Sequence, residues 1–178
     1  MKISSLLLEK KPKLLKKWFD LILETYPPDT AIFLKGQKNR FANPVGHTIF
    51  EGTEGILDQL LQGNDADSIS AFLDNIIRIR AIQNFTPSQA VGFIFLLKKA
   101  IRAELANEIR EQQMHEELFM LESKIDELIS ISFDIYIKYR EKIYKMRANE
   151  LINRTSRLLK RSNMFKELEV EDRGTAGL

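Results

Sequence analysis

Apolar residues recur at intervals of three and four along most of this chain, which is the spacing of one face of an α-helix. Before residue 84 the spacing predicts helices over about 12–26, 43–62 and 68–83, with residues 4–10 as a short separate helix. Their apolar stripes are Leu15, Trp18, Phe19, Ile22 and Leu23, then Val45, Ile49, Ile56 and Leu60, then Ile69, Phe72, Leu73, Ile76 and Ile77. Stripes of this kind bury against one another in a helical bundle.

Prolines, glycines and capping residues mark where these helices begin and end. Tyr26-Pro27-Pro28-Asp29 ends the first helix, and a loop is expected through residues 33–41. The second begins with Asn43 capping before Pro44, or with a capping box of Thr48 and Glu51, and ends at Gly63-Asn64-Asp65. Asp67 or Ser68 is expected to cap the third helix.

Three glycines in the second helix, Gly46, Gly52 and Gly55, each cost helical stability of about 1 kcal/mol relative to alanine. We expect the close approach of another helix to compensate for them.

The segment Thr86-Pro87-Ser88-Gln89 is a strong helix start, because Thr86 and Gln89 can form a capping box with Pro87 in the first turn. The following residues, 90–97, are apolar on every side, which indicates a helix at the centre of a bundle. Phe93, Ile94 and Phe95 are therefore assigned to the core.

Residues 93–173 contain neither proline nor glycine and predict helix almost throughout, with one break expected near 110–117. Beyond Leu118 the apolar residues fall on two faces. One face comprises Leu121, Ile125, Leu128, Ile135 and Tyr139, and the other comprises Phe119, Ile129, Phe133, Tyr136 and Ile137. A helix that is apolar on two sides has two neighbours, so we expect a homodimer with Leu121, Ile125, Leu128, Ile135 and Tyr139 as its candidate interface.

These patterns predict an all-α fold: a helical bundle with a long C-terminal helix, for which a globin-like arrangement is one option. Residues 1–150 form the domain, and residues 151–178 form a helical extension, with Leu151, Leu158 and Phe165 at seven-residue intervals, and a disordered tail. A helix over 114–165 is about 78 Å long, so it breaks or it extends beyond the bundle.

Composition excludes several kinds of chemistry. The 178 residues include no cysteine, which excludes disulfides, thiolate metal sites and cysteine nucleophiles. No metal-ligand spacing is present, and paired carboxylates such as Glu116-Glu117 are adjacent in sequence and expected to be solvated, so we expect no catalytic residue, no metal, no cofactor and no enzyme activity. The N-terminal segment is too short in apolar residues for a signal peptide, and no segment is long enough to span a membrane, so a cytoplasmic protein is expected.

Charge is unevenly distributed although the net charge is only +2. Residues 104–127 are strongly acidic, and residues 138–161 are strongly basic. The favoured interpretation is a solvated helix face, or an antiparallel pairing of these two segments. The alternative is a basic-helix adaptor for a membrane or nucleic acid, although no nucleic acid is expected as a partner.

Arg80 is the most informative single residue, because it falls on the buried stripe of its helix together with Gln83. A guanidinium away from water needs acceptors, and the favoured interpretation is an ion pair with Glu51, Glu54 or another carboxylate, or a side chain whose charged end reaches solvent. The functional alternative is an anionic ligand held by Arg80, Gln83 and Thr86. Haem ligation is the least favoured, because neither His47 nor His115 lies on an apolar helical face.

The strings RIRAIQNFTPSQAVGFIFLLKKAIR (78–102) and FANPVGHTIFEG (41–52), with Trp18-Phe19, resemble the N-terminal domain of the RsbRD type over roughly residues 14–150. That domain precedes a STAS domain in stressosome co-antagonist proteins that act on the switch kinase RsbT. The resemblance implies an all-helical sensor that works through dimers and larger assemblies without enzyme activity. Because the chain ends about thirty residues after the matching region, we expect a free-standing input module whose output surface is the terminal helix.

The sequence therefore predicts a non-enzymatic signalling module that dimerises through its last helix and regulates an unknown protein partner. A small-ligand protein, binding an anion or haem in a globin-like fold, is the alternative.

Overall fold

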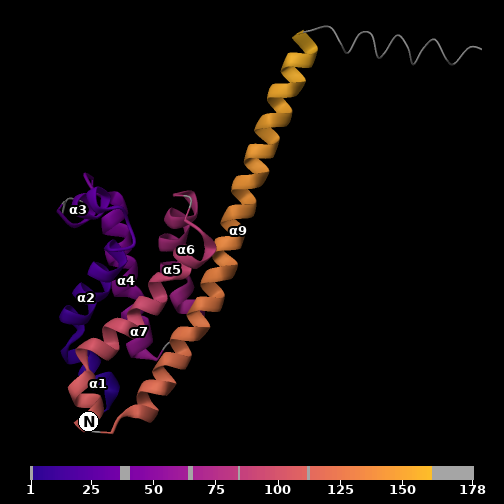
Figure 1. The fold of residues 1–178 in the computed structure, drawn as a ribbon. Coiled ribbons are helices and arrows are strands. Elements are labelled where there is room, and N and C mark those ends of the chain that lie inside the picture. The colour runs from indigo at the N-terminus through magenta and orange to yellow at the C-terminus, as the bar shows by residue number, and fades with distance from the viewer. Residues whose placement is uncertain (1, 37–40, 64–65, 84, 112, 162–178) are drawn as a thin grey trace, which may run out of the picture. The chain divides into compact units, whose positions relative to one another are not determined.

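The computed structural model describes residues 2–36, 41–63, 66–83, 85–111 and 113–161, and every regular element among these residues is an α-helix (Figure 1). The all-α prediction is therefore confirmed. The helices are α1 (Ile3–Glu9), α2 (Lys11–Leu23), α3 (Pro28–Gly36), α4 (Pro44–Gln62), α5 (Ala66–Ile82), α6 (Pro87–Val91), α7 (Phe93–Glu104), α8 (Ala106–Glu111) and α9 (His115–Arg161). The chain forms two compact units, residues 1–139 and 140–178.

In the first unit, α2 packs against α7 and α4, and α4 packs against α5. Trp18 of α2 lies in the middle of the core, with no exposed surface. Its indole Nε1 donates a 2.7 Å hydrogen bond to the carbonyl of Phe93, and the two rings are stacked with their centroids 6.3 Å apart. The buried polar end of the indole is thus satisfied, which a fully buried tryptophan requires.

The segment after α2 differs from the prediction. A loop was expected through residues 33–41, but residues 28–36 form α3. The two adjacent prolines indicate a chain stop, yet Pro28 occupies the first position of a helix, where no amide donor is needed. Asp29 in the first turn and Lys35 in the last turn both complement the helix dipole.

The caps of α4 follow one of the two predicted registers. Asn43 is the N-cap, and its side-chain oxygen accepts a 2.8 Å hydrogen bond from the backbone N–H of Gly46. At the other end Gly63 has a φ of 71°, the left-handed conformation that favours glycine. The start of α5 was predicted two or three residues late: the helix already begins at Ala66, so Asp67 and Ser68 lie inside it.

Two of the three glycines in α4 allow α5 to approach closely, as predicted. A methyl group on Gly52 would lie 2.7 Å from the side chain of Ile76, and one on Gly55 would overlap the ring of Phe72. Gly46 is needed for a different purpose, because a methyl group there would meet the side chain of the Asn43 cap.

The helix start at Thr86 has both hydrogen bonds of the predicted capping box. The apolar run that follows is divided at Gly92 into α6 and α7. Phe93 and Ile94 are buried, but Phe95 is 51% exposed, so its assignment to the core was wrong. Phe95 falls outside the buried stripe of α7, which continues through Leu97 and Ile101.

The predicted break before the last helix is present. Gln113, with a φ of 52°, lies between α8 and α9. Helix α9 has 47 residues and is therefore about 70 Å long. Phe165 and the predicted disordered tail lie outside the described residues, and the domain boundary at residue 150 stays a prediction.

We expect Gly55→Leu to destabilise the first unit by about 2–3 kcal/mol, because the added side chain meets the ring of Phe72 in a packed contact between α4 and α5. Gly36→Leu is the matched control, since nothing lies within 4 Å of the position of its added Cβ. Urea denaturation followed by circular dichroism measures both free energies of unfolding. Equal values for the two variants would contradict the close approach.

Candidate functional site

Arg80 projects from α5 into the first unit and has no exposed surface. Its Nη2 donates two hydrogen bonds of 3.0 Å, to the hydroxyl of Thr25 and to the carbonyl of Gln89. Thr25 follows α2 and Gln89 lies in α6. The guanidinium of Arg80 therefore connects α5 with the end of α2 and with α6.

Three aromatic rings surround the rest of the guanidinium. Its central carbon lies 4.3 Å from the ring centroid of Phe85, 5.3 Å from that of Tyr26 and 5.9 Å from that of Phe93. The rings of Tyr26 and Phe85 are themselves in edge-to-face contact, with centroids 5.2 Å apart. A cation over aromatic faces in a desolvated site gains about 2 kcal/mol, so the rings replace part of the lost hydration.

The favoured sequence interpretation of Arg80, an ion pair with a carboxylate such as Glu51 or Glu54 or a charged end in solvent, was wrong. Glu51 contacts His47 at 3.0 Å, and Glu54 lies 3.6 Å from Lys11. Within the described ranges no carboxylate pairs with Arg80, and its Nε and Nη1 have no hydrogen-bond partner there. Burial lowers the pKa of Arg80, and the neighbouring Tyr26 partly opposes this.

The other two candidate ligand residues lie near Arg80 but are exposed. Gln83 accepts a 3.2 Å hydrogen bond from the hydroxyl of Tyr26. Thr86 uses its hydroxyl to cap α6. Arg80 therefore donates to the chain's own atoms, and a role for Arg80, Gln83 and Thr86 in holding an anion stays a prediction.

The five residues chosen as a dimer interface all pack on the chain's own core. Ile125 and Leu128 are buried, with 0% and 2% of their surface exposed, so they have no surface to offer a second chain. Leu121, Ile135 and Tyr139 are partly buried, and an intermolecular role for them stays a prediction. The other face is divided: Tyr136 is buried, whereas Phe119, Phe133 and Ile137 are exposed by 70%, 45% and 36%.

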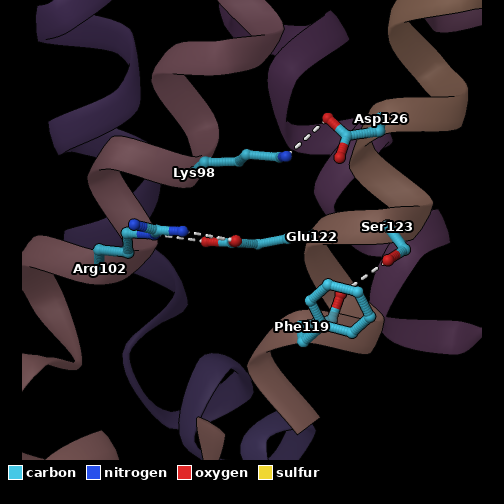
Figure 2. Close-up of polar contacts among 6 residues, drawn as sticks. All are labelled: Lys98, Arg102, Phe119, Glu122, Ser123 and Asp126. Carbon is cyan, nitrogen blue, oxygen red and sulfur yellow. Dashed lines mark hydrogen bonds and ion pairs between the residues drawn. The ribbon is translucent and has the colours of Figure 1, made fainter. Parts of the chain in front are cut away.

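Ion pairs connect the beginning of α9 to α7 (Figure 2). Arg102 makes a bidentate contact with Glu122, from Nε to Oε1 at 2.5 Å and from Nη2 to Oε2 at 2.7 Å. One turn further on, Lys98 pairs with Asp126 at 2.6 Å. The hydrogen bond from Arg102 lowers the pKa of the Glu122 carboxyl, against the opposing effect of its burial.

Two tyrosines hold the next turns of α9. The hydroxyl of Tyr136 donates a 2.6 Å hydrogen bond to the carbonyl of Phe85, and that of Tyr139 donates one of 2.8 Å to Asp74. Phe85 is also the ring closest to the Arg80 guanidinium. Phe85 therefore contacts both the Arg80 guanidinium, through its ring, and α9, through its carbonyl.

Sequence reasoning missed this role of Phe85 and Tyr136. A signal was present for Phe85, because an apolar residue directly before a helix N-cap commonly packs against the first turns of that helix. The pairing with Tyr136 depends on tertiary placement, since 51 residues separate the two.

The segments of opposite charge do not pair as an antiparallel helix pair within one chain, because residues 115–127 and 138–161 belong to the single helix α9. Acidic side chains of the 104–127 segment pair instead with Lys10, Lys98 and Arg102. In the second unit, Arg154 pairs with Glu150, and Arg140 lies over the ring of Tyr144 at 5.0 Å.

The two histidines lie apart. His47 is half-buried beside Glu51, and His115 is exposed at the start of α9. Among the residues with described side chains, no three of the metal-ligating types His, Cys, Asp and Glu are grouped for metal binding. In the same part of the chain, no helix has the length and apolar character needed to cross a bilayer.

Comparison with known proteins identifies a family. The model of the family described as RsbT co-antagonist protein rsbRD N-terminal domain matches residues 12–151. No curated protein and no protein of solved structure matches the chain.

We expect Arg80→Met to change the free energy of unfolding by less than about 1 kcal/mol, because a buried charge without a carboxylate partner contributes little net stability over an apolar side chain of similar length. Arg80→Ala is the comparison and should cost about 3 kcal/mol through the space that it leaves. Urea denaturation measures both. A decrease of more than about 3 kcal/mol in the free energy of unfolding for Arg80→Met would show that the buried charge does contribute net stability.

We expect Arg102→Gln to destabilise the first unit by about 1 kcal/mol at pH 7, since the Arg102 side chain is 64% exposed and its ion pair is partly screened. Because the pKa of Glu122 is lowered in the folded chain, its stabilising effect is present at neutral pH and is lost as pH falls through the carboxyl range. The difference in free energy of unfolding between wild type and variant should therefore be smaller at about pH 3 than at pH 7, as measured by denaturant titration. The same difference in free energy of unfolding at acid and neutral pH would contradict a stabilising ion pair between Arg102 and Glu122.

Proposed function

Because the chain belongs to the RsbT co-antagonist protein rsbRD N-terminal domain family, we propose that it is a signalling input domain that self-associates through α9 and regulates a partner protein in stress-response control. Family membership places it among the input domains of stress-response regulators. Self-association, the regulated partner and action in the cytoplasm are our inference. Enzyme activity has no part in this proposal.

The observation that carries the proposal is the exposed apolar series on α9. Ile137, Tyr144, Leu151 and Leu158 recur every seven residues, and all four are exposed. A seven-residue repeat of apolar side chains is the pattern by which helices pair in coiled coils. The three beyond residue 140 are exposed by 56–64%, which is costly for large apolar side chains unless a partner covers them.

Charge is unevenly distributed along α9. Its first turns, 115–127, carry an excess of carboxylates, and residues 138–161 carry an excess of lysine and arginine. A pairing centred on the series 137–158 places the basic stretches of two copies beside each other, and Glu122 and Asp126 already pair with Arg102 and Lys98 of their own chain. Charge therefore does not select the partner, and the apolar repeat alone supports self-association.

The same helix is suited to transmit a change in the bundle. Its earlier turns are held by Arg102 and by the carbonyl of Phe85, the residue on which Arg80 stacks. A signal that alters the packing around Arg80 would therefore alter the support of α9, and a partner bound to α9 would respond.

We expect Leu151→Glu combined with Leu158→Glu to convert a dimer into a monomer at tens of micromolar, because charges in the apolar seam oppose pairing. Sedimentation velocity measures the change. Ile152→Glu is the matched control, since Ile152 is 61% exposed beside Leu151 but lies about 100° around the helix. A wild-type monomer, or equal dissociation by the control, would contradict self-association through this seam.

A further inference from the structure

The first unit contains a cavity of about 690 Å³ lined by residues of α2, α3 and α4 and by the Asn43 cap. Sites for small molecules usually measure about 300–1,000 Å³, so this volume suits a ligand. The cavity is separate from Arg80, Gln83 and Thr86, none of which lines it.

Most of the cavity wall is apolar. Leu15 and Leu34 contribute buried side chains, each with 5% of its surface exposed, and Phe50 is 39% exposed. The ring of Phe19 meets that of Phe50 edge to face, with centroids 5.6 Å apart. The two rings give an apolar wall against which a hydrocarbon body can pack.

The charged residues of the lining are mainly cationic: Lys11, Lys16 and Lys35 against one carboxylate, Glu54. Lys11 pairs with Asp58 at 2.6 Å, and this hydrogen bond raises the pKa of Lys11. Lys35 pairs with Asp20 at 2.8 Å. Lys16 has no ion-pair partner in the part of the chain that the structure describes.

We propose that this cavity binds an organic anion with an apolar body, its carboxylate beside Lys16 and its body against Phe19 and Phe50. An ammonium group next to an apolar wall favours a ligand that combines negative charge with hydrocarbon surface over one that has only one of these. Binding of this kind does not depend on self-association or on a regulated partner.

Isothermal titration of the full chain with dodecanoate, below its micelle concentration, tests the proposal. We expect one saturable site per chain, weaker binding of dodecanol, and no binding of acetate or dodecyltrimethylammonium. Naphthalene-2-carboxylate distinguishes an aromatic from an aliphatic body, and saturable binding of either carboxylate supports the proposal. Absence of binding by both carboxylates, or equal binding of dodecanol and dodecanoate, overturns it.

Two matched pairs of variants locate the site. Lys16→Glu should weaken dodecanoate binding about tenfold or more, while Lys17→Glu, the exposed neighbour outside the lining, should change it less than about twofold. Phe50→Asp should abolish binding, while Phe33→Asp, at a residue that is 51% exposed on α3, should preserve it. Equal effects within either pair overturn the assignment, and thermal unfolding of all four variants confirms that they are folded.

Discussion

The desolvated guanidinium of Arg80 constrains how the segments around it are placed, although it contributes little net stability. A charge without exposed surface and without a carboxylate partner among the described residues is tolerated only where dipoles and aromatic faces replace water. Thr25, Gln89 and Phe85 supply these: Thr25 follows α2, whereas Phe85 and Gln89 lie at the start of α6. The position of α6 relative to α2 and α5 is therefore fixed by polar geometry as well as by apolar burial.

The two stretches of helix α9 differ in how far their apolar side chains are buried. Between residues 115 and 139 it is held by Ile125 and Leu128 in the core and by ion pairs at its surface. Between residues 140 and 161 its large apolar side chains are exposed, including Leu151 and Leu158. A single helix contains both stretches.

The sequence predicted those features that depend on neighbours along the chain. The capping box at Thr86, the cap at Asn43 and the break before α9 are local, and all three are present. The close contacts at Gly52 and Gly55 were predictable because a glycine in a helix interior needs a reason in packing.

Other features depend on residues distant in sequence, and these were missed or wrong. The inward stripe placed Arg80 inside the bundle, but no local signal indicates that aromatic rings take the place of a carboxylate. The exposure of Phe95 follows from the break at Gly92 and from which side of α7 meets α2. The cavity is equally non-local, since Phe19 and Phe50 belong to different helices.

Helix α2 and the residues that follow it connect the cavity with the Arg80 centre. Leu15 and Phe19 line the cavity, and Thr25 accepts from Arg80 a few residues later. A ligand changes the state of α9 only if it binds two packings of the bundle with different affinity. Movement of α2 against α4 would provide such a difference, because it alters the cavity wall and the position of Thr25 together. Phe85 would then carry the change from Arg80 to Tyr136 on α9.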